Sequence, residues 1–170
     1  MRVLLAIDGS EHSHAALAEV ASRRWPDRTK IEVVTVVRPQ MLAAADPMTK
    51  LAPAEPLQEQ RRNAPDLLAH AVKSIKARAP RRPVVAKIIE GTPHDVIVEE
   101  ARRWEADLIV LGSHGYGPFR RAIFGSVAAA VALGAHCGVE IIRMDPSGVP
   151  TLDEDRDVIA ISVHSREHIA

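Results

Sequence analysis

Short runs of aliphatic residues recur along the chain, and apolar residues at helical spacing separate them. The first run, 3–7, is apolar at every position, which is typical of a strand buried on both faces of a parallel sheet. Further, largely aliphatic runs lie at 31–37, 84–89, 107–111 and 139–144, and the run 107–111 also has the character of a buried strand. The pattern therefore predicts five strands.

The segments between these runs predict helices. After Ser10, whose side chain can cap a helix, apolar residues recur at helical spacing as far as Trp25. Similar spacing predicts helices around 67–75, 94–105 and 126–135. Strands that alternate with helices indicate an α/β fold, a doubly wound parallel sheet with helices on both faces.

Proline marks the longest irregular stretch and one helix. Residues 38–56 hold four of the twelve prolines and predict a long loop. Pro65 stands next to the helical pattern of 67–75. It is either the first helical residue or a kink, because an interior proline costs about 3 kcal/mol.

The character of the chain changes after Asp145, which suggests a domain at 1–144 and a linker with a C-terminal tail at 145–170. A proline-rich stretch at 146–150 precedes an acidic stretch and the apolar run 158–163. That run is either an extra C-terminal strand, able to pair with a sheet edge of another subunit, or a partly ordered tail.

Composition narrows the function classes. The 170 residues include 22 Lys plus Arg and 22 Asp plus Glu, so bulk positive charge for nucleic acid or a membrane surface is missing. Only 3% of the residues are aromatic, which argues against a surface that stacks single-stranded bases. We therefore expect neither nucleic acid nor a membrane as partner.

Cysteine usage and the first apolar run indicate a cytoplasmic protein. The single cysteine, Cys137, can form no disulfide within the chain and no multi-cysteine zinc site, and a buried inert thiol is its simplest interpretation. The first apolar run ends at Asp8 after five residues, too early for a signal peptide or a membrane span.

A glycine-rich segment after the fourth predicted strand carries the strongest chemical signal. Glycines let backbone amides approach phosphate oxygens, and a helix that begins at 125–126 adds free N–H groups and a positive dipole end. In the simpler alternative, the glycines only permit tight turns and Ser126 only caps a helix.

Asp8 follows the first strand and would face the same crevice as the glycine segment. Its carboxylate can accept hydrogen bonds from a ribose hydroxyl or an adenine amino group. The alternative is a role in the turn or the helix cap of 8–10.

The spacing of the glycines points to a known family. Gly112, two residues, Gly115, nine residues, Gly125 and then Ser126 match the nucleotide signature of the universal stress protein family without a gap. The segments 6–10, 91–93 and 106–112 also resemble that family. The resemblance covers roughly residues 1–144.

This resemblance implies a five-stranded sheet of order 3-2-1-4-5, of the adenine nucleotide alpha hydrolase-like type. In the ATP-binding branch it also implies bound ATP, ADP or AMP, often with Mg or Mn at the phosphates. Transferred by position, the base and ribose contacts fall on Ala6, Ile7, Asp8, Val36 and Gly112, and the phosphate contacts on His114, Gly115, Gly125, Ser126 and Val127.

The function expected from the resemblance is that of an ATP-binding sensor or regulator in a stress response. The chain has no Walker lysine and no evident acid–base pair, so we assign no catalytic residue and expect at most weak ATP hydrolysis. The alternatives are a slow nucleotide hydrolase or nucleotidylyl transferase that uses His114, and a dimeric interaction module that binds no nucleotide.

The family's last strand often pairs with its counterpart across a dimer axis, which implies a homodimer. Here that strand carries Glu140, where the family commonly has a hydrophobic residue. A charge on such a strand is a typical way to protect a sheet edge; in the alternative, Glu140 pairs with Arg143 or with an arginine of a second subunit.

Overall fold

The computed structural model describes residues 1–38, 54–114, 125–143 and 158–161. The strands of this part are β1 (Arg2–Ala6), β2 (Lys30–Val37), β3 (Val84–Glu90), β4 (Leu108–Gly112), β5 (Gly138–Ile142) and β6 (Val158–Ile161). The helices are α1 (Glu11–Ser22), α3 (Ala54–Arg78), α4 (Pro93–Arg103) and α5 (Ser126–Gly134).

All strands join one sheet of order β3-β2-β1-β4-β5-β6. The first five strands pair in parallel, and β6 runs antiparallel to β5. The predicted order 3-2-1-4-5 is therefore confirmed, with β1 in the interior of the sheet between β2 and β4.

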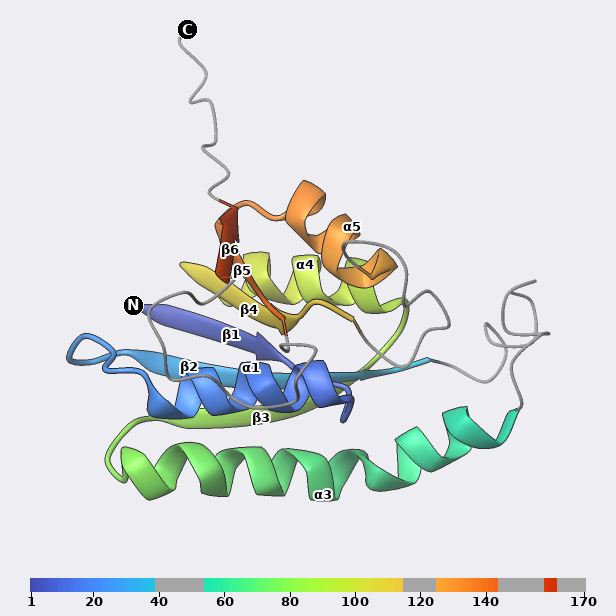
Figure 1. The fold of residues 1–170 in the computed structure, drawn as a ribbon, viewed down its shortest axis with the longest axis horizontal. Coiled ribbons are helices and arrows are strands. Elements are labelled where there is room, and N and C mark those ends of the chain that lie inside the picture. Colours follow the sequence, from blue (N-terminus) through green and yellow to red (C-terminus); the bar gives the residue numbers. More distant parts are fainter. Residues whose placement is uncertain (39–53, 115–124, 144–157, 162–170) are drawn as a thin grey trace, which may run out of the picture.

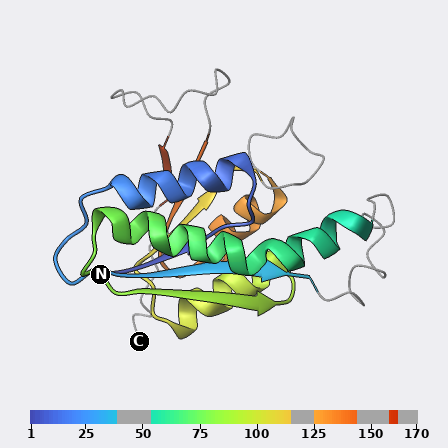
Figure 2. The same cartoon turned by 90° about the horizontal axis from the view of Figure 1, so that it is seen from below.

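Helices cover both faces of this sheet (Figures 1 and 2): α1 and α3 lie on one face, and α4 and α5 on the other. Successive residues of a strand point to opposite faces. Leu5 of β1 accordingly packs in the cluster under α1 and α3, whereas its neighbour Leu4 packs in the cluster under α4 and α5. This two-sided burial explains why β1 is apolar without alternation, whereas β3, at the edge of the sheet, is mostly exposed or half-buried.

The helix α3 differs from its prediction. It begins at Ala54, within the segment that we expected to be a loop, and it contains Pro65 in its interior. The kink alternative therefore holds, and Figure 1 shows the first part of α3 leaving the line of the rest. Residues 39–53 of the predicted loop lie outside the described residues.

Glu140 does not pair with the residues that we expected. Its carboxylate accepts hydrogen bonds from Arg23, which follows α1, and one of them is 2.7 Å long, from Nη1 to Oε2. The prediction of Arg143 or a second subunit was wrong, because the end of α1 brings a guanidinium over the middle of β5.

The apolar run near the C-terminus forms a strand over 158–161, so the strand alternative is confirmed for these residues. It pairs with β5 of its own chain. Residues 162–163 of the predicted run lie outside the described part.

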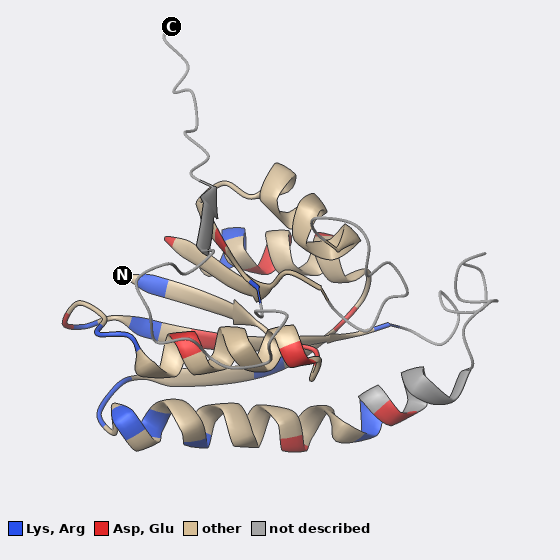
Figure 3. Ribbon diagram, viewed as in Figure 1, with Lys and Arg blue, Asp and Glu red and all other residues tan. Residues whose placement is uncertain are grey.

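Charged residues of both signs are spread over the ribbon, and several Lys and Arg gather at the C-terminal end of α3 (Figure 3). Among the described helices, we find none that combines the length and the apolar character needed to cross a membrane.

Candidate functional site

The carboxyl ends of β1 and β4 lie next to each other, with Ala6 opposite Leu111. The chain leaves β1 for α1 on one face of the sheet and leaves β4 for α5 on the other face. Such a reversal of direction between two neighbouring parallel strands is where open α/β sheets bind ligands. The structure thus brings Asp8 and the glycine segment to the same edge, as the sequence predicts.

Asp8 shapes the turn between β1 and α1. Its Oδ1 accepts a 2.9 Å hydrogen bond from the Ser10 amide, and Gly9 adopts a φ of 87°, the left-handed region that favours glycine. The turn role is therefore confirmed. A carboxylate has about four acceptor positions, so this bond leaves capacity for a ligand hydroxyl or amino group.

The Ser10 hydroxyl links α1 to the start of the glycine segment. It accepts a 3.3 Å hydrogen bond from the Ser13 amide, which caps the helix, and it donates to the His114 carbonyl at 3.2 Å. One hydroxyl thus connects the first turn of α1 to the residue that follows Ser113 after β4.

Gly112 is required by a close approach to α1. A Cβ at this position would lie 2.6 Å from the carbonyl carbon of His12 and 2.8 Å from its carbonyl oxygen. Because both atoms belong to the backbone of a helix, they cannot move aside cheaply. The sequence placed Gly112 near a ribose, and the structure adds this packing role, which the glycine spacing alone does not reveal.

Ser113 closes the glycine loop at its base. Its amide donates to the Ile142 carbonyl at 2.7 Å, and its carbonyl accepts from the Gly125 amide at 2.7 Å. The residue at which the chain leaves β4 is thus hydrogen-bonded directly to the residue that precedes α5. Gly115 and the rest of 115–124 lie outside the described residues.

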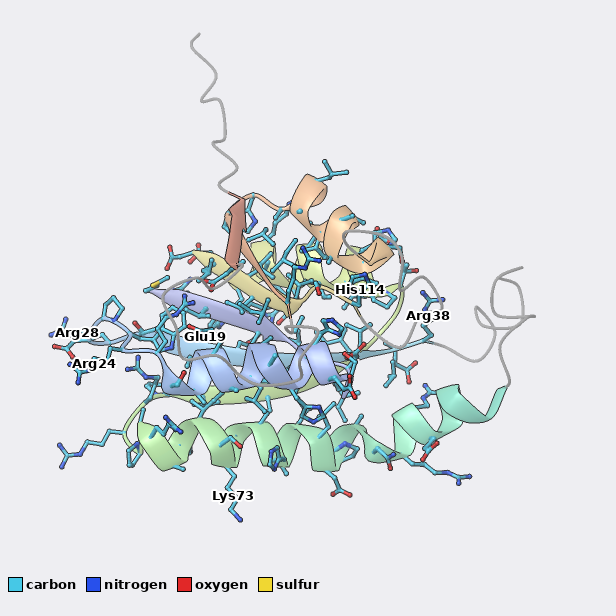
Figure 4. The ribbon with its side chains drawn as sticks, viewed as in Figure 1. Glu19, Arg24, Arg28, Arg38, Lys73 and His114 are labelled. Atoms are coloured by element: carbon cyan, nitrogen blue, oxygen red, sulfur yellow. The ribbon has the colours of Figure 1, made fainter. Side chains whose placement is uncertain are left out.

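His114 lies beside the end of β4, close to α5 (Figure 4). Its Nδ1 is 3.1 Å from the Ser113 hydroxyl, and its ring centroid is 5.2 Å from that of His12. The Ser113 side chain is fully buried, so this serine is not placed to attack a substrate. The arrangement suits a positioned imidazole that donates a hydrogen bond.

The N-terminus of α5 faces the region to which the loop returns. Gly125 is the N-cap, and its carbonyl accepts from the Ala129 amide at 3.0 Å. The first amides of a helix have no intrahelical acceptor, and the first turn of α5 contains no acidic residue. Backbone donors and the helix dipole at 126–127 thus suit an anion.

The apolar residues predicted to hold a base are divided between the two faces. Ala6 and Val36 belong to the cluster under α4 and α5, and both are buried. Ile7 packs on the opposite face, and its amide bonds to the Val34 carbonyl at 2.9 Å. The structure therefore brings Ala6 and Val36 together and directs the Ile7 side chain elsewhere.

Arg38 was not foreseen at this edge. It directly follows β2, whose carboxyl end borders that of β1, and Figure 4 shows it on the same side of the molecule as His114. The signal that could have revealed it is its place after a buried strand, two positions beyond Val36.

Two hollows of the described structure lie away from this edge. One, of about 520 Å³, is lined at the amino ends of β4 and β5 by Asp107, His136 and Cys137. Burial, with Asp107 nearby, raises the pKa of the Cys137 thiol, which fits an inert cysteine. Within the described ranges, no three His, Cys, Asp or Glu side chains are grouped to hold a metal ion.

A model of the universal stress protein family matches residues 1–143. The chain is 32% identical over 145 residues to a universal stress protein of Mycolicibacterium smegmatis, a match that covers 83% of this chain and 45% of that protein. The chain thus spans about half the length of the first curated relatives that it matches.

Solved structures of universal stress proteins share the fold. The UspA protein of Lactobacillus plantarum superposes with a TM-score of 0.68 at 23% identity, over 85% of this chain and 97% of that one. A universal stress protein in complex with cAMP gives 0.58 at 25% identity, over 84% and 96%. A family member from Arabidopsis thaliana with AMP bound gives 0.59 at 20% identity, over 89% and 96%.

Proposed function

Because the chain belongs to the universal stress protein family, we propose that it binds an adenine nucleotide at the carboxyl ends of β1 and β4. ATP is the nucleotide that we propose, with ADP and AMP as weaker ligands, since the glycine signature that accommodates phosphates is complete. The relatives with cAMP and AMP bound support an adenine nucleotide in this family.

One observation supports the proposal most directly. The turn of Asp8, both ends of the glycine loop and the N-terminus of α5 meet at one edge of the sheet, tied by Ser10 and Ser113. Acceptors for a ribose or base and donors for phosphates are thus held at fixed positions around one crevice.

The residues take distinct roles in the proposed complex. Ala6 and Val36 contact the base, Asp8 accepts from the ribose or the adenine amino group, and Gly112 allows close approach. His114, Gly115, Gly125, Ser126 and Val127 surround the phosphates. Any Mg²⁺ or Mn²⁺ would be held through phosphate oxygens, because the described residues offer no cluster of metal ligands.

We further propose a cytoplasmic homodimer that acts as a sensor or regulator, not as a fast enzyme. Bound nucleotide would shift the equilibrium of contacts to a second copy or another protein. The Ser113 amide bonds to the last residue of β5, so the base of the glycine loop is physically joined to the far half of the sheet.

Ser126 provides the sharpest test of the phosphate position. Ser126→Glu places a negative charge at the start of α5, where it favours the helix but repels phosphate. In calorimetric titrations we expect its ATP affinity to fall about tenfold or more, or about 1.4 kcal/mol, with adenosine binding unchanged.

Ser126→Gln is the matched control, because it is similar in size and carries no charge; it should bind ATP much as the parent does. Equal ATP affinity of the Glu and Gln variants would show that phosphates do not lie at α5. A parent that binds no adenine nucleotide would refute the proposed function itself.

Asp8→Asn tests the other end of the ligand. Asparagine keeps the acceptor that the Ser10 amide needs but removes the charge and replaces one oxygen with a donor. We expect binding of both adenosine and ATP to weaken about tenfold. Asp66→Asn, at an exposed position of α3, should change neither affinity.

The enzyme alternative draws support from His114, whose imidazole lies within hydrogen-bond distance of the Ser113 hydroxyl and in tilted contact with the His12 ring. A slow hydrolase or nucleotidylyl transferase would show ATP turnover that disappears in His114→Ala while nucleotide binding persists. ATP turnover that is absent in the parent, or unchanged in the variant, would contradict the enzyme alternative and leave the regulator as the proposed function.

A further inference from the structure

The strand β6 turns β5 from an edge strand into an interior one. All four residues of β5 from Val139 to Ile142 have partners in β6, from Val139 opposite Ile161 to Ile142 opposite Val158. The pairing is antiparallel, whereas every other strand pair in the described sheet is parallel.

This strand is an addition to the family domain. The family model ends at residue 143, and β6 begins at Val158. The strand β6 therefore lies beyond the segment that the family model matches.

Without β6, the outer side of β5 would be well suited to pairing with another strand. Val139 and Ile141 are buried on one face and Glu140 and Ile142 on the other, and the outward amides and carbonyls between them would lack partners. Charges often protect such edges, but Glu140 is neutralised by Arg23 of its own subunit.

The β5 strand of a second copy fits the position that β6 occupies beside β5. Two identical strands related by a two-fold axis perpendicular to the sheet pair only in the antiparallel sense, which is the sense of β6. The partner that matches this edge in direction, apolar character and charge is therefore another molecule of the same chain.

We propose that β6 competes with a second copy of the chain for the outer edge of β5. With β6 in place the chain is a monomer, and when β6 leaves, two β5 strands pair to form the dimer. This inference rests on the homodimer of the proposed function and specifies how its assembly is regulated. Its test requires no nucleotide.

The tether gives β6 a strong advantage over a free partner. The connection is residues 144–157, and a short tether holds a strand at an effective concentration on the order of millimolar. Because both copies must release β6, a second copy at micromolar concentration displaces it only when the contact between the two β5 strands is far stronger than that of β6, or when β6 is weakened.

A double variant, Ile159→Pro with Ala160→Pro, weakens β6 in the full-length chain. Consecutive amides of a strand point to opposite edges, so one of the two prolines removes a donor to β5. Ser147→Pro is the control, since it adds a proline to a stretch that already contains Pro146 and Pro150.

Sedimentation velocity from about 1 to about 200 μM measures the outcome. We expect a monomeric parent and control, and a double variant whose dimer dissociation constant is at least about tenfold lower. Hydrogen exchange should show β5 amides protected in that dimer and fast-exchanging after dilution. A folded double variant that stays monomeric overturns the proposal, and so does a dimeric parent that becomes monomeric in the variant.

A second variant keeps the test decisive if the prolines prevent folding. Doubling the connection with Gly-Ser residues lowers the effective concentration of β6 about threefold, and because both copies must release it, the dimer dissociation constant should fall about eightfold. A dimer fraction equal to the parent's at every concentration overturns the proposal. Calorimetry with ATP on the same samples reports the nucleotide site separately, so the two proposals can fail independently.

Discussion

Two glutamates are buried on opposite faces of the same sheet, and they are neutralised in different ways. Glu140 of β5 is 5% exposed beneath the end of α1, and Glu32 of β2 is 1% exposed beneath α4. Both would be costly as unpaired carboxylates. The two differ in the partners that the fold supplies for a buried carboxylate.

Glu140 has a complete set of partners. Arg23 donates to both of its oxygens, and the same guanidinium donates to Glu19 from Nε at 3.1 Å. It also lies 4.8 Å from the centre of the Trp25 ring. The hydrogen bonds to Glu140 raise the pKa of Arg23, which marks a stable ion pair.

Glu32 has an incomplete set of partners. Its Oε2 contacts Lys87 Nζ at 2.7 Å, but Oε1 is buried without a partner among the described residues. Lys87 is shared with Glu100, at 2.8 Å. Burial, and then the hydrogen bond with Glu100, raise the pKa of Glu32, whereas hydrogen bonds from Arg103 lower that of Glu100. The cluster therefore favours a proton on Glu32 and a charge on Glu100.

The largest effect should come from removing Arg23. Arg23→Met leaves Glu140 buried and unpaired, and we expect a loss of about 3–5 kcal/mol in the free energy of unfolding at pH 7. Urea denaturation followed by circular dichroism measures it. Arg24→Met, at the exposed neighbouring position, should change stability by less than about 0.5 kcal/mol.

A double variant separates the effect of the unpaired Glu140 carboxylate from the effect of losing the packing of the Arg23 side chain. Adding Glu140→Met to Arg23→Met removes the unpaired carboxylate, so most of the stability should return. A double variant as unstable as Arg23→Met would mean that the Arg23 side chain acts through packing, and the contrast between the two glutamates would lose its basis.

A smaller effect is expected for Glu100→Gln, because Glu32 remains to pair with Lys87. Arg103 loses its carboxylate, and we expect a loss of about 1.5–3 kcal/mol at pH 7. Glu99→Gln, the exposed neighbour, is the control.

The pH dependence of Glu100→Gln has a definite sign. The lowered pKa of Glu100 contributes stability that is present above the ordinary value of 4.5 and is lost as pH falls toward the lowered one. The difference in the free energy of unfolding between parent and variant should therefore become smaller as pH falls below 4.5. A gap that widens on acidification would contradict the assignment of the charge to Glu100.

The sequence predicts the sheet but not these ion pairs. Aliphatic runs identify β1 to β5, and burial on both faces makes the run continuous in β1, whereas β3, at the edge of the sheet, is largely exposed or half-buried. Glu140 and Arg23 are 117 positions apart, and nothing local indicates that the end of α1 crosses β5. For Pro65, the sequence left two alternatives open, and the structure selects the interior position in α3.

The candidate site also has a part that the sequence predicts and a part that it does not. Asp8 and the ends of the glycine loop were placed correctly at one edge, because the ends of parallel strands meet there. The packing of Gly112 on His12 and the bond from Ser10 to His114 depend on how closely α1 approaches β4, which spacing along the chain does not encode.

Trp25 offers a finer test of the Glu140 side. Its indole N–H donates to the Val20 carbonyl at 2.8 Å in the last turn of α1, and its ring lies under Arg23. Trp25→Phe keeps an aromatic ring but loses the indole N–H donor, and we expect it to lower the free energy of unfolding by about 1 kcal/mol. Trp25→Leu also removes the cation–π contact, so it should lower the free energy of unfolding by up to about 1 kcal/mol more. Urea denaturation measures both losses. Equal losses would assign no role to the ring.

The smallest effect, and the most informative in sign, is expected for Glu32→Gln. The amide group of glutamine can donate to Glu100 as the protonated carboxyl does, so stability near pH 5 should stay within about 1 kcal/mol of the parent. The raised pKa of Glu32 contributes stability that is present below 4.5 and is lost as pH rises through the raised value.

Glutamine cannot ionise, so the variant escapes that loss and should gain stability relative to the parent as pH rises from 4.5 through the raised pKa of Glu32. Urea denaturation at several pH values measures the difference, with Glu59→Gln, at an exposed position of α3, as a control that should stay level. A Glu32→Gln difference that is also level with pH would contradict the raised pKa of Glu32, and its incomplete set of partners would then have no effect on its ionisation.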